Sequence, residues 1–337
     1  MFASFITFIS VFLFLCTIVV WFVCWAVARI CRQRISFAPF AYTGLDIVVL
    51  FLTVMFYGYR FGRFQLHVQR TTYTSPKVPE AFNGYKIVHI SDLHLSSLAD
   101  SHAFLQRIIY TINAQQPDLI CFTGDFVGFG VEEAIPFTHT LRQLHAKDGI
   151  MSVLGNHDFA LYHHGLTEAE KEEKVNQLTA YQRDTLGWQL LRNQSYIIQR
   201  DSAYLQIIGV DNTSCQGQGF QTISRGDLSA AMTLPNSLIA SSPNSLSPIK
   251  ILLSHDPSHW RGEVVPTTDI PLTLSGHTHA GQVRLFGYPI SSLMFTESEG
   301  WYHNDGQSLH INTGLGCTLP VRIGVPPEIT VIKLRKQ

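Results

Sequence analysis

Five short apolar segments, each followed by Asp, His or Asn, recur along the chain after residue 85. They span residues 86–90, 117–122, 150–154, 249–253 and 270–274. Continuous apolar runs of this length are typical of β-strands that are covered on both faces. A chain that must bury five such strands is restricted to folds in which other layers cover a largely parallel sheet.

Amphipathic segments separate the predicted strands. Residues 102–115 place apolar side chains on one face, which predicts a helix. Residues 167–186 open with Thr167 and Glu170 in the pattern of a capping box and predict a solvated surface helix. Alternating strands and helices predict an α/β fold. The Ser- and Gly-rich residues 215–247 are predicted to be an irregular insertion.

Polar residues at the predicted strand ends indicate one shared site, because ligands of such sheets bind outside the carboxyl ends of the strands. The set comprises Asp92, His94, Asp125, Asn156, His157, Asp158, His255, His277 and His279. Mixed oxygen and nitrogen ligands suit divalent Mn, Fe or Zn. Two such ions sharing a carboxylate would activate water and stabilise charge on a phosphoryl oxygen. The pattern therefore predicts phosphate-ester hydrolysis.

The motifs, taken in order, resemble those of the calcineurin-like metallophosphoesterase superfamily. They are Asp92-x-His94, Gly124-Asp125, Gly155-Asn156-His157-Asp158, Ser254-His255 and Gly276-His277-Thr278-His279. The resemblance implies a two-sheet β-sandwich flanked by helices, and a site with two divalent metal ions, manganese by preference with iron or zinc as alternatives.

The resemblance also implies a role for each site residue. One metal is expected on Asp92, His94, Asp125 and His279, and a second metal on Asp125, Asn156, His255 and His277. His157 is expected to act on the phosphoryl transition state or to protonate the leaving oxygen. Asp158 is expected to orient His157.

Two further segments are similar to those of small membrane-attached bacterial phosphoesterases related to YaeI and YkuE: residues 276–289 and residues 313–330. Relatives of that subgroup include a UDP-2,3-diacylglucosamine pyrophosphatase of lipid A biosynthesis. The resemblance thus implies an acylated sugar nucleotide as substrate, with 2,3-diacylglucosamine 1-phosphate and UMP as products. The alternatives are a broad-specificity membrane-attached phosphodiesterase or phosphatase, and a non-catalytic scaffold with a structural metal site, which the intact His157 disfavours.

Residues 1–28 contain no charged residue and are followed by Arg29, Arg32 and Arg34. About 20 apolar residues cross a bilayer as a helix, so this run predicts a membrane span. A cleaved signal peptide is the alternative, disfavoured by the length of the run and the lack of a basic start. The apolar residues 47–59 predict a second span, a re-entrant segment or a helix in the interface.

These features predict three parts: a membrane anchor at 1–64 with one span or two, a linker at 65–84, and a metallophosphoesterase domain at 85–337. The 24 Lys and Arg against 25 Asp and Glu argue against a nucleic-acid binder. The six scattered cysteines favour a reducing compartment. The cysteines and the basic residues after the first span together predict that the protein lies in the bacterial inner membrane, with its catalytic domain on the cytoplasmic face. The expected partners are the acylated or phosphodiester substrate and membrane lipid, without an obligatory protein partner.

Other side chains have structural interpretations. His89 is expected to be a core residue or to lie just behind the site, and seven histidines are expected on the surface: His102, His139, His145, His163, His164, His303 and His310. Five aromatic residues are expected either to line a path for acyl chains or, for most of them, to pack the second sheet: Phe286, Tyr288, Phe295, Trp301 and Tyr302.

Overall fold

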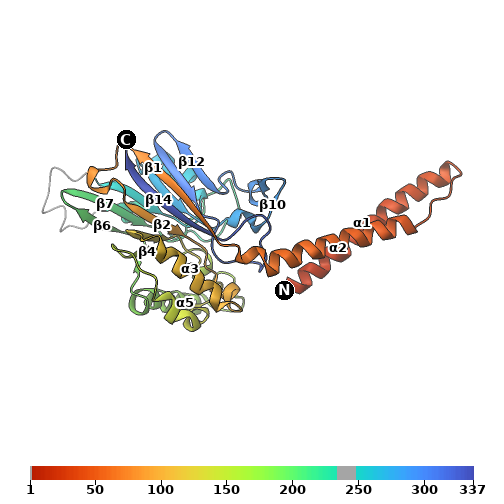
Figure 1. The fold of residues 1–337 in the computed structure, drawn as a ribbon, viewed down its shortest axis with the longest axis horizontal. Helices are drawn as coiled ribbons and strands as arrows, with labels where there is room; N and C mark the ends of the chain where they lie inside the picture. The colour runs from red at the N-terminus through yellow and green to blue at the C-terminus, as the bar shows by residue number, and fades with distance from the viewer. Residues whose placement is uncertain (1, 234–247) are drawn as a thin grey trace.

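The structure is a computed structural model that describes residues 2–233 and 248–337. In these residues two six-stranded sheets form the body of the molecule, and a pair of long helices extends from one side of it (Figure 1). The first sheet contains, in spatial order, β1 (His67–Ser75), β14 (Glu328–Lys336), β2 (Lys86–Ile90), β3 (Leu119–Phe122), β4 (Ile150–Ser152) and β5 (Gln189–Leu190).

The second sheet contains, in spatial order, β12 (Gly300–Asn304), β13 (Gln307–Ile311), β9 (Leu272–Ser275), β8 (Ile249–Leu253), β7 (Ala203–Gly209) and β6 (Gln194–Arg200). A short hairpin joins β10 (Arg284–Leu285) to β11 (Tyr288–Pro289). The inner strands of both sheets are parallel: β2 pairs with β3 and β3 with β4, while β7 pairs with β8 and β8 with β9. Their carboxyl ends therefore gather at one edge of each sheet.

The helices are α1 (Phe2–Ile30), α2 (Ala38–Arg60), α3 (His102–Ala114), α4 (Thr138–Leu141), α5 (Glu168–Ala180), α6 (Leu228–Met232) and α8 (Val265–Thr267). The predicted capping box is confirmed at the start of α5, where Thr167 and Glu170 satisfy each other's backbone amides. The residues after α5 continue as a π-helical turn. The described part of the predicted insertion is not wholly irregular, because α6 forms within it; residues 234–247 lie outside the described residues.

The two sheets pack face to face. Side chains of the first sheet, including Ile87 and Met151, share a fully buried cluster with Leu205, Ile251 and Leu272 of the second. A second cluster joins the outer face of the first sheet to α3 and α5, and a third covers the outer face of the second sheet. The predicted class, a two-sheet α/β sandwich flanked by helices, is confirmed.

The predicted linker at 65–84 is wrong in part, because it contains β1. This strand pairs in parallel with β14 along nine residues, from His67 opposite Glu328 to Ser75 opposite Lys336. It is an edge strand whose side chains are mostly exposed or half-buried, so it lacks the continuous apolar run that marks the buried strands. The chain that follows the two long helices is therefore fixed to the two-sheet body from its first residues.

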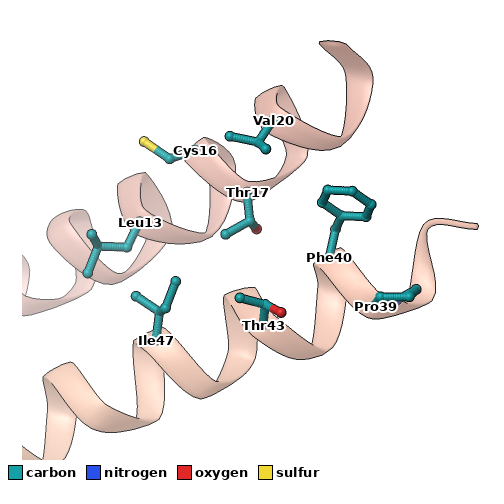
Figure 2. Close-up of a pocket in the computed structure, with 8 residues that line it drawn as sticks. All are labelled: Leu13, Cys16, Thr17, Val20, Pro39, Phe40, Thr43 and Ile47. Carbon is teal, nitrogen blue, oxygen red and sulfur yellow. The ribbon is translucent and has the colours of Figure 1, made fainter. Parts of the chain in front are cut away.

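Both apolar stretches form helices long and apolar enough to cross a membrane. At 1.5 Å per residue, the 29 residues of α1 and the 23 of α2 exceed or match the roughly 30 Å hydrocarbon core. The second helix is longer than the predicted 47–59 and includes Asp46. The helices lie side by side in an antiparallel hairpin, with a cavity of about 480 Å³ between them lined by both, at Leu13 and Phe40 among others (Figure 2).

The end of α2 contacts the two-sheet body directly. The Arg322 backbone amide donates to Gly58 O at 3.4 Å, and a Cβ on Gly58 would collide with Val321. Arg63, just after the helix, is buried; it forms an ion pair with Asp100 and donates to Ser97 O. These contacts fix which face of the body meets the two long apolar helices.

Candidate metal centre

The predicted site residues all lie at one edge of the sandwich. Asp92 and His94 follow β2, Asp125 follows β3, and Asn156 follows β4. From the second sheet, His255 follows β8, and two more histidines follow β9: His277 and His279. Because the carboxyl ends of the parallel strands of both sheets meet here, side chains up to 187 positions apart come together.

Five of these seven residues have left-handed backbone conformations: Asp92, His94, Asp125, His277 and His279, with φ between 38° and 71°. Non-glycine residues rarely adopt this conformation, and such strain tends to gather at functional sites. Gly276 is required for a different reason. A Cβ there would collide with the side chains of Ser91 and Asp92, so only glycine lets the loop after β9 approach β2.

Three side chains surround the first possible metal position. Ligand atoms of Asp92, His94 and His279 lie within 4.8 Å of one another. The two histidine Nε2 atoms are 3.1 Å apart, and His279 Nε2 is 3.3 Å from Asp92 Oδ1. Asp125 Oδ2 lies 3.4 Å from His94 Nε2 and so reaches this group from the neighbouring strand.

The second group forms on the other side of Asp125. Ligand atoms of Asp125, His255 and His277 also lie within 4.8 Å of one another. His255 Nε2 is 3.2 Å from Asp125 Oδ2 and 3.2 Å from His277 Nδ1. The same carboxylate oxygen thus faces both groups, which is the position that a carboxylate shared by two cations must occupy.

The charges of the site favour a cation. Burial would raise the pKa of Asp125, but His255 and His157 hold that pKa well below its usual range, so the carboxylate is ionised. Burial would lower the pKa of His255, but the charge and hydrogen bond of Asp125 raise it to about 10. Burial lowers the pKa of His94 to about 3, which leaves the ring neutral, as a metal ligand must be. Asp125 therefore draws a positive charge, from a proton or a metal, to the centre of the site.

Two buried oxygens provide the test of whether these residues fit metal ions. Within the described part of the chain, Asp92 Oδ1 and Asn156 Oδ1 accept no hydrogen bond although both are shielded from solvent. The 3.3 Å contact between Asp92 Oδ1 and His279 Nε2 does not have the geometry of a hydrogen bond. The Asn156 amide nitrogen donates to Tyr162 Oη at 3.0 Å, which turns its oxygen away from that partner. Buried acceptors without a donor are costly unless something else satisfies them, and a hard or borderline divalent cation does so. The donor set fits such ions.

His157 lies at the rim of the site and is half-buried. One of its ring nitrogens lies within 4.8 Å of ligand atoms of His94 and Asp125, and its Nδ1 is 3.2 Å from Gly128 O. The expectation that Asp158 orients His157 is wrong, because the structure shows no hydrogen bond between these two described side chains. The Asp158 carboxylate instead accepts hydrogen bonds from the amides of Phe126, Val127 and Gly155. It therefore shapes the loops that carry Asp125 and Asn156, and Gly128 O orients the His157 ring.

One of the predicted surface histidines is buried. His310 is fully shielded, and its Nδ1 lies 3.1 Å from Nδ1 of His89, which is buried as predicted. Polar and apolar residues alternate along most of β13, which predicts one exposed face, but both faces of that strand are buried. His89 also contacts Thr123, whose carbonyl lies 2.7 Å from His255 Nδ1. The histidine pair thus stands directly behind the site.

Three residues near the site were not predicted. Arg322 is fully buried with a guanidinium nitrogen 3.3 Å from His279 Nδ1, Asp256 Oδ2 is 3.8 Å from His277 Nε2, and the Tyr162 ring packs on His157 at 4.3 Å. Asp256 directly follows a motif histidine, which is a signal that could have found it. Arg322 and Tyr162 reach the site from loops without any metal-ligand pattern.

The site opens into a cavity of about 810 Å³. Asp125, Asn156, His157, His277 and His279 line one end of it. The remaining wall is mainly apolar and comes mostly from the segments after β9 and from both long helices, including Phe5 of α1 and Val54 of α2, with Tyr162 and Phe220 contributing from other loops. A single cavity thus connects the candidate metal centre with the helices that are apolar enough to cross a membrane.

Comparison with known proteins agrees with this geometry. A family model described as calcineurin-like phosphoesterase matches residues 85–281. The chain is 33% identical over 298 residues to an uncharacterized metallophosphoesterase, YkuE, of Bacillus subtilis; the match covers 82% of this chain and 90% of that protein.

Two further relatives carry more descriptive names. The chain is 27% identical over 309 residues to the UDP-2,3-diacylglucosamine pyrophosphatase LpxG of Chlamydia trachomatis, with 80% of this chain and 89% of that protein covered. It is also 27% identical over 273 residues to a transmembrane protein with a metallophosphoesterase domain from Danio rerio, with 77% of this chain and 55% of that protein covered. The two apolar helices of this chain and its similarity to the transmembrane protein from Danio rerio together indicate attachment to a membrane.

Proposed function

Because the chain belongs to the calcineurin-like phosphoesterase family, and is therefore a metal-dependent phosphoester hydrolase, we propose that it cleaves the phosphoanhydride of a lipid-linked sugar nucleotide. The specific proposal is hydrolysis of UDP-2,3-diacylglucosamine to 2,3-diacylglucosamine 1-phosphate and UMP, a step of lipid A biosynthesis. The relative from Chlamydia trachomatis supports this choice, since the match spans most of both chains.

The observation that carries the proposal is the cavity. Its polar end holds the residues that suit two divalent ions, and its apolar wall runs to the membrane helices. An amphiphilic substrate needs both surfaces: acidic phosphates beside the cations, and a dry, apolar space for acyl chains. A soluble nucleotide makes no use of an apolar wall, whose burial is favourable only for an apolar ligand.

The residues of this chain have distinct tasks in the proposed reaction. When bound, two divalent cations, manganese by preference, supply charge stabilisation and an acidified water. Asp125 holds the two ligand groups in register, and Asn156 offers its unpartnered oxygen. Water adds to one phosphorus and the bond from that phosphorus to the bridging oxygen breaks. The role proposed for His157, at the rim, is to protonate this bridging oxygen as it leaves with the other phosphate.

The test is release of UMP from UDP-2,3-diacylglucosamine by the purified full-length protein with Mn²⁺. His157→Ala is expected to lower the rate by about 10²–10⁴-fold, the usual contribution of a general acid, with bound metal unchanged. His164→Ala, an exposed histidine of the same region, is the matched control and should keep full activity. Turnover of an aryl phosphodiester without any release of UMP would favour the broad-specificity phosphodiesterase instead.

We also propose that the catalytic domain lies on the cytoplasmic side of a bacterial inner membrane. The helical hairpin removes one of the two observations that supported this orientation. With α2 as a second span, Arg29, Arg32 and Arg34 lie at the far end of the hairpin and no longer support that side. The remaining support is that all six cysteines are unpaired. Cys31 is exposed between the helices, so a membrane-impermeant maleimide should label it on intact cells. Labelling of Cys215 in place of Cys31 would mean that the catalytic domain lies outside the cytoplasm, opposite to the proposed orientation.

A further inference from the structure

An apolar surface projects from the catalytic body beside the cavity. The side chain of Phe286 at the tip of the β10–β11 hairpin is 100% exposed, and Leu293, a few residues on, is 86% exposed. Tyr288 between them is 75% exposed. Single exposed apolar residues are ordinary on a protein surface, but a projecting group of large ones marks a contact with a partner or a membrane.

The hairpin tip pays a conformational cost to present this side chain. Phe286 has φ 51° and Gly287 φ 89°, so both central residues of the two-residue turn are left-handed. Such turns favour Asn or Gly at the first position, whereas a bulky residue there is unfavourable. A strained position occupied by phenylalanine, with no described residue packed over it, points to a role for the exposed ring.

The base of the hairpin is rigid and polar. Arg284 donates to Gly287 O and to Gly324 O, both at 3.2 Å, and to the Glu299 carboxylate at 2.6 Å. A neighbouring loop joins the same rim: the Gly219 amide donates to Met294 O at 2.8 Å, next to Phe220, which is 68% exposed. The exposed apolar side chains are therefore held in place by hydrogen bonds beneath them.

This rim continues the wall of the cavity onto the membrane helices. Leu285, Ile290 and Met294 line the cavity together with Phe51 and Val54 of α2. Those two α2 residues lie six to nine positions before its end at Arg60, about 9–14 Å along the helix axis. If α2 spans a bilayer from Arg60, this part of the wall lies at the level of the lipid. Figure 1 shows β10 on the side of the body from which α1 and α2 extend.

We propose that Phe220, Phe286, Tyr288 and Leu293 insert into the bilayer surface next to the α1–α2 hairpin and seat the mouth of the cavity in lipid. The occupant is the bilayer rather than a second protein, because the docked helices fix this side of the body against the membrane. A lipid substrate then enters the cavity sideways without passing through water. The insertion rests on membrane attachment, and only the identity of what enters rests on the proposed function.

Photo-crosslinking tests the insertion without any activity measurement. The full-length protein carries p-benzoylphenylalanine in place of Phe286 and is reconstituted into phosphatidylcholine–phosphatidylglycerol vesicles. Illumination should give phospholipid adducts at this position, identified by mass spectrometry. The matched control carries the same group in place of Ser202, which is exposed at the opposite end of the strands, and should give at least 10-fold fewer lipid adducts. Equal yields at both positions, or crosslinks to a second copy of the chain, would overturn the proposal.

A kinetic comparison separates this inference from the proposed function. The double variant Phe286→Asp, Leu293→Asp should raise the KM for a vesicle-embedded acylated substrate about tenfold or more, with kcat/KM for a water-soluble aryl phosphodiester unchanged. Ser202→Asp should change neither. Equal losses on both substrates would mean that the metal centre was disturbed, and no loss on the embedded substrate would reject the rim as its entrance. Absence of activity on the acylated substrate in the wild type, with lipid crosslinks intact, would reject only the proposed substrate.

Discussion

The strands β2, β3 and β4 carry buried charge at both ends, and the two ends neutralise it in opposite ways. At the amino end, Asp118 accepts hydrogen bonds from the Lys86 amide at 2.8 Å and from Lys147 Nζ at 2.9 Å, and pairs with Arg200 at 3.3 Å. At the carboxyl end, Asp125 faces His94 and His255. The same residue type thus flanks one strand, β3, on both sides with different neighbours.

The difference lies in which groups can complete the charge balance. The amino end includes Lys and Arg, which carry their own permanent charges and can reach partially into solvent. At the carboxyl end Asp125 faces imidazoles, which neutralise it only when a proton or a metal is added. The buried Arg322 at this end donates to backbone carbonyls and contacts His279, and it forms no ion pair with a carboxylate in the described residues. A closed ion-pair network is a structural element, whereas an incomplete one is a binding site.

The largest effect is expected when Asp is replaced by the isosteric Asn at each end in turn, because only the carboxyl end is expected to bind metal. Asp125→Asn removes the shared carboxylate and should lower hydrolysis by more than about 100-fold, the upper range for residues that merely orient metal ligands. Bound manganese, measured by elemental analysis of the purified protein, should fall with it. Asp118→Asn should leave both quantities within twofold of the wild type. Full metal content in Asp125→Asn would mean that the carboxyl end does not depend on this carboxylate to bind a metal.

Metal addition should stabilise the protein through the carboxyl end alone. A ligand at 100 times its Kd adds about 2.7 kcal/mol to the folded state. For a body of this size that corresponds to a rise in Tm of about 5–10 °C, measured by differential scanning fluorimetry in detergent with and without Mn²⁺. The Asp118→Asn variant should show the same rise from a lower starting Tm, and Asp125→Asn little or none. A rise that persists in Asp125→Asn would place the stabilising metal elsewhere.

The sequence was sufficient to locate the carboxyl end. The five predicted strands are buried on both faces, so they appear as continuous apolar runs, and the motif residues follow them directly. The strands that escaped prediction lie at or near sheet edges. In β1 and β6 exposed and half-buried side chains dominate, so hydrophobic periodicity is weak there.

The contacts around the site could not be predicted, because they arise only in three dimensions. Asp158 follows His157 in sequence, yet its carboxylate accepts from the amides of the loop after β3. Arg322 and His310 carry no local signal for burial. The position of His310 depends on the pairing of β13 in the second sheet. Arg322 lies between β13 and β14, so its position depends on how the chain crosses from the second sheet to the first. Sequence motifs identify the candidate ligands, and packing decides which other residues hold those ligands in position.

A smaller effect is expected from the amino end, on stability. Asp118→Ala leaves the Lys86 amide without its acceptor and removes one of the two carboxylates that Arg200 contacts, the other being Asp148 at 3.2 Å. Hydrogen bonds to charged groups contribute about 1.5–3 kcal/mol. Solvent reaches Lys147 and Arg200, so about 1–2 kcal/mol is expected. Lys147→Ala should cost below about 0.5 kcal/mol, because that side chain is 68% exposed. Urea unfolding measures both, and equal losses would mean that Asp118 acts through Lys147 alone.

The smallest effect is the pH dependence of that loss. Burial would raise the pKa of Asp118, but the hydrogen bonds from the Lys86 amide, Lys147 and Arg200 lower this pKa below its usual value. A carboxyl whose folded pKa lies below its unfolded value of about 3.9 adds stability above that pH, and the gain disappears as pH falls through the folded pKa. The difference in unfolding free energy between wild type and Asp118→Asn should therefore be constant from pH 7 to pH 5 and shrink only below about pH 4. A difference that already shrinks between pH 7 and pH 5 would assign the titration to histidine, and the amino end would then resemble the carboxyl end.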